Sequence, residues 1–155
     1  PIQSNKTRTI AESFAWVHSV DRLKIAERLS AQRPAELPAL NICLQVNISG
    51  EASKSGCDPE ELPALAPAIS KLPNLHLRGL MAIPAATPDT AQQHAAFARL
   101  RALRDSLGLP LDCLSMGMSD DLEAAIAEGA SWVRIGSAIF GARSYNAPPT
   151  QGNPR

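Results

Sequence analysis

Short apolar runs that alternate with helix-like segments constrain the fold of this chain more than any other feature. The runs have the length of buried strands, and they are "WVHSV" (16–20), "LNICLQVNI" (40–48), "LHLRGLMAI" (75–83), "LDCLSMG" (111–117) and "SWVRIGSAIFG" (131–141). Strands separated by helices pair in parallel, with right-handed crossovers. The pattern predicts five βα units in one α/β sheet, either an open doubly wound sheet or part of a (β/α)8 TIM barrel.

The length of the chain limits the barrel interpretation. A complete barrel takes about 250 residues and seldom fewer than 200, so a chain of 155 residues with five units would lack about three of the eight. One domain with a proper core is expected at this length, and we place it at residues 1–145. The ending "NAPPTQGNPR" (146–155) holds no core-forming residues and is predicted to be disordered.

Capping residues mark the helices between the runs. Thr87 and Pro88 predict the start of the clearest helix, and Gly108 stands where a C-terminal glycine belongs. Asp21 is expected to cap the helix after the first run.

Two further helices are predicted, one with clear start and end signals and one with prolines inside it. Asp120 and Glu123 have the spacing of a capping box, and Gly129 is expected to close the helix that follows them. In the segment 58–72, Asp58 and a proline start a helix well, but two later prolines predict that it is kinked or begins late.

Composition excludes several classes of partner. Fifteen basic residues balance fifteen acidic ones, so no nucleic acid or anionic membrane surface is indicated, and no apolar stretch approaches the ~20 residues of a membrane span. The three cysteines, Cys43, Cys57 and Cys113, are odd in number and fit no metal-binding spacing. They are interpreted as reduced thiols of a cytoplasmic protein without a metal site.

Two Gly/Ser-rich segments after the last two runs are the strongest candidates for chemistry. In a barrel, phosphate is most often held by the loops after the seventh and eighth strands. Gly117 and Gly136 would let the backbone approach an anion, and Ser115, Ser119 and Ser137 would add hydroxyl groups. The alternative is that both segments are ordinary turns at strand ends.

The adjacent charged residues need their own interpretation. Asp120 and Asp121 would repel a phosphate, so we assign them to helix capping and the anion to the loop amides. Arg134 lies in an apolar run and needs a partner there, either a carboxylate on a neighbouring strand or the ring of a phosphate-bearing cofactor. His18 and His76 are interpreted as core or strand-end histidines.

These segments resemble the pyridoxal phosphate homeostasis protein family. The resemblance is carried by "LRGLMAIP", "LSMGMSDDLEAAIAEGASWVRIGSAIFGAR", "QVNIS" with "SKSG", and "QSNK", and it runs from Pro1 to about Tyr145. It implies a barrel like the N-terminal domain of alanine racemase, with pyridoxal 5′-phosphate (PLP) bound at the carboxyl ends of the strands.

The resemblance also implies the roles of individual residues. Arg134 would face the pyridine nitrogen and keep it unprotonated. The positions that would hold the phosphate are Ser115, Gly117, Met118, Ser119, Gly136 and Ser137.

The Schiff-base lysine of the family is not found in its motif. In the family this lysine lies on the first strand, in a motif resembling "AVSKTK", and none of the four lysines, Lys6, Lys24, Lys54 and Lys71, has that context. The chain is therefore interpreted as the C-terminal part of a barrel. Its covalent anchor is expected outside the chain, and a companion N-terminal fragment could complete it.

Three functions remain open at this point. The leading one is a non-catalytic carrier or regulator that binds PLP and helps control intracellular vitamin B6 and amino acids. The alternative is a PLP-dependent amino-acid racemase, but Tyr145 is the only tyrosine for the second base that a racemase needs. A phosphosugar isomerase or lyase would need a glutamate or lysine base at a strand end, and none is convincing.

Overall fold

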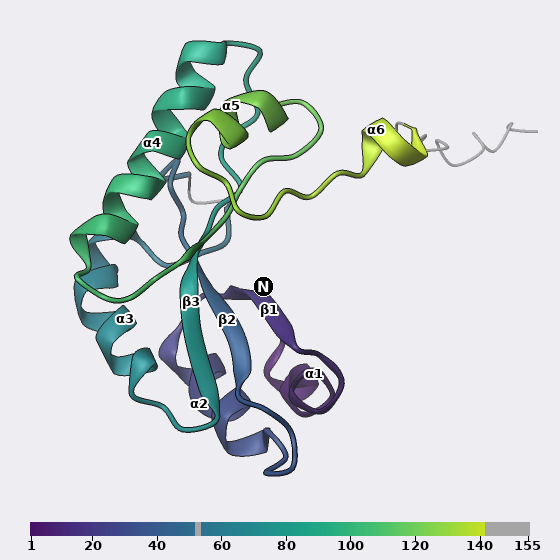
Figure 1. Ribbon diagram of the computed structural model, residues 1–155, viewed down its shortest axis with the longest axis vertical. Helices are drawn as coiled ribbons and strands as arrows, with labels where there is room; N and C mark the ends of the chain where they lie inside the picture. The colour runs from purple at the N-terminus through teal and green to yellow at the C-terminus, as the bar shows by residue number, and fades with distance from the viewer. Residues whose placement is uncertain (52–53, 142–155) are drawn as a thin grey trace, which may run out of the picture.

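The computed structural model describes residues 1–51 and 54–141, which form one parallel sheet with helices packed on it (Figure 1). Its strands are β1 (Trp16–Val20), β2 (Leu40–Gln45), β3 (Leu75–Met81) and β4 (Cys113–Ser115). They are neighbours in the order β1-β2-β3-β4, which is also their order in the chain. A doubly wound sheet reverses its strand order, whereas a (β/α)8 barrel does not. The order therefore favours the partial barrel.

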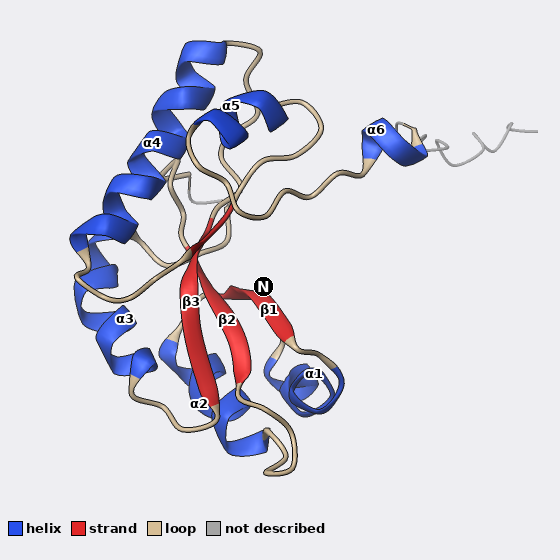
Figure 2. Ribbon diagram, viewed as in Figure 1, coloured by secondary structure: helices blue, strands red, loops and turns tan. Residues whose placement is uncertain are grey.

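Helices precede the first strand, connect consecutive strands and follow the last one. They are α1 (Thr7–Ser13), α2 (Leu23–Gln32), α3 (Leu62–Ser70), α4 (Thr90–Ser106), α5 (Leu122–Ala127) and α6 (Ser137–Phe140), with 3-10 turns η1 (Ser4–Lys6) and η2 (Pro59–Glu61). Figure 2 shows α3 and α4 on the same side of the sheet, while α6 extends away from it. No helix in the described ranges is long and apolar enough to cross a membrane.

The main core lies between the sheet and its helices. Ile42 and Leu80 from the strands and Leu29, Ile69 and Phe97 from the helices are all fully buried in it. A smaller cluster forms separately from Cys43, Met81 and Cys113, with Trp16 packed against it. The two clusters together bury residues of all four strands, and the predicted phosphate loops follow the last of these strands.

The predicted fifth strand, residues 131–141, is wrong as a strand. Within the described residues this run makes one bridge, between Ser115 and Trp132, and Ser137 already begins α6. Met116 N still donates to Trp132 O at 3.0 Å. None of the side chains in this run is fully buried, so little apolar burial stabilises a longer strand here.

The start of α4 differs by a few residues from the prediction. The cap is Asp89, whose carboxylate accepts hydrogen bonds from Ala91 N at 2.9 Å and Gln92 N at 3.3 Å. Thr87, the predicted cap, accepts instead from Asp89 N at 3.1 Å. Gly108 follows the helix with φ +62°, as expected for a C-terminal glycine.

Two other predicted caps do not form. Asp21 pairs with Arg22 at 2.6 Å, and α2 begins without a side-chain cap. The Asp120–Glu123 capping box is also absent, because Asp121 is the N-cap residue of α5 and makes no capping bond to the helix.

The helix expected in 58–72 begins late, as predicted. A capping box joins Asp58 and Glu61, with Asp58 N donating to Glu61 Oε2 at 2.9 Å, and η2 precedes α3. The domain boundary near 145 and the tail 146–155 lie outside the described residues.

Candidate functional site

Two hydrogen bonds bring the Gly/Ser segments together where β4 ends. Arg134 N donates to Gly117 O at 2.9 Å, and Ala138 N donates to Ser119 Oγ at 3.1 Å. The first bond continues the short pairing that begins at Trp132. The second joins the tip of the "SMGMS" loop to the residue after Ser137. The two segments are thus neighbours at the carboxyl edge of the sheet.

Gly117 is required by its surroundings. Its φ is +96°, a conformation that residues with a side chain seldom adopt. A Cβ atom there would lie 2.5 Å from the Cβ of Ala125, which is fully buried in α5. The loop can therefore pass close to α5 only because this residue is glycine.

The loop after Gly117 is closed by a carboxylate. Met118 N donates to Asp121 Oδ1 at 2.6 Å, and the Met118 side chain remains 43% exposed. This amide already has a partner, so it is not free for an anion. Asp121 thus stabilises the loop and not the helix that it precedes.

The second segment is more open. Gly136 and Ser137 are exposed, and Gly136 O accepts hydrogen bonds from the amides of Ile139 and Phe140 at 3.0 and 2.9 Å. The side chains of Ile139 and Phe140 are 67% and 85% exposed. Contacts within the segment therefore hold it more than contacts with the core do.

Arg134 turns inward from this edge. Its Nη1 donates to Ser115 Oγ at 2.6 Å and its Nη2 donates to Ala82 O at 2.9 Å. No ion pair joins it to a carboxylate within the described residues, so the predicted carboxylate on a neighbouring strand is not found. Burial lowers the pKa of Arg134, but a guanidinium remains charged in proteins.

Ser115 differs from the other predicted phosphate ligands. It is fully buried, and its hydroxyl contacts Arg134 on one side and His18 Nδ1, at 2.8 Å, on the other. The structure therefore groups Ser115 with Arg134, and Ser119 with the segment around Ser137. The sequence did not mark His18 as part of the site.

A hollow of about 970 Å³ opens beside these residues. One wall comes from the segment after β3 and the start of α4, with Thr87 and His94, and the other from Gly117, Asp121 and Arg134. Its volume suits a small ligand of cofactor size.

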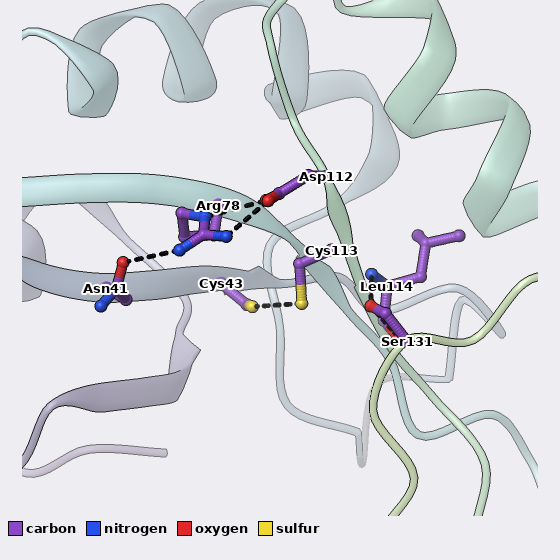
Figure 3. A network of polar contacts seen from close by, with 7 residues as sticks. All are labelled: Asn41, Cys43, Arg78, Asp112, Cys113, Leu114 and Ser131. Atoms are coloured by element: carbon purple, nitrogen blue, oxygen red, sulfur yellow. Dashed lines mark hydrogen bonds and ion pairs between the residues drawn. The ribbon is translucent and has the colours of Figure 1, made fainter.

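A second polar network lies toward the amino-terminal ends of the strands (Figure 3). Arg78 Nε donates to Asp112 at 2.8 Å, its Nη1 donates to Asn41 at 3.1 Å, and its guanidinium lies 4.9 Å from the Trp16 ring centre. In barrels this end serves stability and the opposite end carries the site. The network is therefore structural.

The cysteines are all free and buried. Cys43 and Cys113 meet with their sulfur atoms 3.6 Å apart, and this hydrogen bond lowers the pKa of Cys113 to about 7 while the pKa of Cys43 is raised. Burial raises the pKa of Cys57 to about 12.

Comparison with known proteins identifies relatives along nearly the whole chain. The family model described as alanine racemase, N-terminal domain, matches residues 2–144. A pyridoxal phosphate homeostasis protein of Pseudomonas aeruginosa is 76% identical over 148 residues, 96% of this chain. The protein of that description from Escherichia coli K12 is 54% identical over 94% of the chain. The chain spans 64% of the length of each of these two relatives.

Solved structures agree with this comparison. PipY of Synechococcus elongatus, with PLP bound, superposes with a TM-score of 0.80 at 39% identity, covering 91% of this chain and 68% of PipY. The alanine racemase of Corynebacterium glutamicum superposes with a TM-score of 0.60 at 20% identity, covering 90% of this chain and 38% of the racemase. At that identity the second likeness concerns the fold alone.

Proposed function

Because the chain belongs to the alanine racemase N-terminal domain family, we propose that it binds PLP at the carboxyl edge of its sheet. The protein to which this chain belongs would control the free level of this cofactor and would have no turnover reaction of its own. The observation that carries the proposal is the pairing of the two Gly/Ser segments through Gly117 and Ser119. The relatives named for pyridoxal phosphate homeostasis and the PLP-bound PipY support it.

The donors on the chain suit the two ends of PLP. The phosphate would be held by Ser119, Ser137 and the backbone near Gly117 and Gly136, with the exposed Met118 side chain covering it. Close backbone approach and hydroxyl donors are what an anion requires. In this proposal the engaged Ser115 hydroxyl acts on Arg134, and the Arg134 guanidinium faces the pyridine nitrogen.

When bound, PLP supplies an aldehyde that reacts with amines and a ring that accepts electron density. The residues of this chain would bind and orient it. An arginine at the pyridine nitrogen would keep that nitrogen unprotonated and so weaken the ring as an electron acceptor, which suits a carrier better than an enzyme. The lysine that anchors the aldehyde in the family is proposed to lie outside this chain.

The racemase alternative has less support. A racemase needs a base on each face of the substrate. Tyr145, which sequence analysis considered for this role, lies outside the described residues. The likeness to alanine racemase at 20% identity concerns the fold alone.

We also propose a cytoplasmic setting and a second segment that pairs with the sheet. The free, buried cysteines support the first. In the described residues β1 pairs only with β2, so its other edge is open, and open edges are normally covered. A companion N-terminal fragment or a second copy would cover it, whereas a strictly monomeric native mass without any co-purified fragment would argue against this.

Binding measurements with paired ligands test the main proposal. We expect PLP to bind this chain measurably, and pyridoxal, which lacks the phosphate, to bind much more weakly. The double variant Ser119→Ala/Ser137→Ala should weaken PLP binding by about tenfold or more, because charge-assisted hydrogen bonds are lost. Ser106→Ala, at the exposed end of α4, is the matched control and should change nothing. Equal affinities for PLP and pyridoxal would refute the proposed phosphate site.

A further inference from the structure

The Ser115 hydroxyl has a hydrogen-bonding direction that its neighbours dictate. Arg134 Nη1 lies 2.6 Å from Ser115 Oγ and can only donate, so the oxygen accepts from it. The single Oγ–H is then free to point to its other partner, His18 Nδ1, at 2.8 Å. Because Ser115 is fully buried, no solvent competes for this hydrogen. The oxygen could also accept from a ring N–H, but its own hydrogen would then have no acceptor among the described residues, so we assign His18 Nδ1 as the acceptor, with the ring proton on Nε2.

The surroundings of His18 suit a neutral ring. Its ring packs edge-on against Trp132, with centres 5.3 Å apart at 88°, and against Trp16, with centres 5.7 Å apart at 62°. Burial, and secondarily the positive charge of Arg134, lower the pKa of His18. Both effects keep the imidazole uncharged, as an acceptor at Nδ1 requires.

We propose that His18 is a positioning residue for the ring end of the cofactor site. Its Nδ1 orients the Ser115 hydroxyl, and the oriented oxygen, together with Ala82 O, fixes the plane of the Arg134 guanidinium. The inference rests on the proposed function, since it gives Arg134 the pyridine nitrogen as its target. The chain of contacts links β1 to β4 and to the segment after it, across 97 positions of sequence.

The direction of the hydrogen bond between Ser115 and His18 can be tested without any cofactor. Nitrogen-15 NMR of the ligand-free protein should show His18 with its proton on Nε2. In His18→Phe, which retains ring packing but has no acceptor, the Arg134 side-chain signals should show faster motion. A His18 proton on Nδ1, or unchanged Arg134 signals in His18→Phe, would overturn the inference.

Cofactor binding then tests the consequence. His18→Phe should weaken PLP binding about fivefold, the worth of one net hydrogen bond, and shift the absorption of bound PLP in the direction seen for Arg134→Lys. His18→Asn places an amide oxygen near the position of Nδ1 and should restore most of both properties. His76→Phe, at an exposed histidine of β3, is the matched control and should behave as the unmodified protein.

The outcomes separate the two proposals. Absence of PLP binding by the unmodified protein would refute the proposed function, while the NMR measurements would still decide the role of His18. Equal effects of His18→Phe and His18→Asn on binding and absorption would overturn the positioning role. If His18→Phe does not fold, Ser115→Ala carries the same expected shift in absorption, and an unshifted spectrum there would also overturn it.

Discussion

Replacing Gly117 with alanine should destabilise the protein by about 2–6 kcal/mol. Holding a non-glycine residue at φ +96° costs about 1–3 kcal/mol. The added Cβ would lie 2.5 Å from the Cβ of the buried Ala125, and overpacking of this kind costs about 1–3 kcal/mol more. Urea unfolding followed by the fluorescence of Trp16 and Trp132 measures the free energy of unfolding.

Gly129→Ala separates the two contributions. Gly129 has nearly the same φ, +92°, but an added Cβ would meet nothing within 4 Å. This control should lose only the conformational part, about 1–3 kcal/mol. Adding Ala125→Gly to Gly117→Ala removes the clash, so the double variant should be more stable than the sum of the single changes by about 1–2 kcal/mol. Equal losses at Gly117 and Gly129, or strict additivity with Ala125→Gly, would refute the reasoning.

Three further predictions follow from particular contacts. Gly79→Ala should lower the free energy of unfolding by more than about 3 kcal/mol, because its Cβ would lie 1.8 Å from Cys113 O and β4 would have to move. The control Gly136→Ala, where an added Cβ meets open space, should change it by no more than about 0.5 kcal/mol in the same urea assay. Asp89→Ala should lower the stability by about 1 kcal/mol in thermal unfolding, and Thr87→Ala should lower it less. A larger loss for Thr87→Ala would show that Thr87 is the main cap of α4. The lowered pKa of His18 means that the unfolded chain binds a proton there more readily than the folded one. The free energy of unfolding should therefore fall as the pH drops below about 6.5, and the urea midpoint of His18→Asn should fall less steeply over that range than the midpoint of the unmodified protein.

The sequence predicted which runs are apolar enough for strands better than it predicted which runs find a partner to pair with. The runs at 16–20, 40–48 and 75–83 form strands, because long apolar runs are stable only when buried in a sheet. The run at 131–141 is also rich in apolar residues but gains only one bridge, since strand formation depends on packing and pairing partners outside the run. The helix α1 was not expected, because its sequence buries little more than Thr7 and Ala11.

Caps and the site were predictable to different degrees. Thr87 and Asp89 are both good capping residues two positions apart, and only the path of the backbone selects Asp89. The Gly/Ser segments could be placed together because strand order brings the carboxyl ends to one edge. His18 could not be placed, because its contact with Ser115 depends on how β1 and β4 face each other across the inside of the sheet.

The two ends of the proposed site are built with unequal rigidity. At the ring end, Arg134 is fixed by Ser115, by Ala82 O and by its own backbone bond to Gly117, and Ser115 is fully buried. At the phosphate end, Ser119 meets the second segment through one hydrogen bond, and Gly136 and Ser137 are exposed. A ligand that binds both ends must order the second, and ordering costs reduce affinity. The phosphate would therefore supply the attraction but also carry most of the ordering cost, while Arg134 sets the orientation of the ring at little cost because it is already in place.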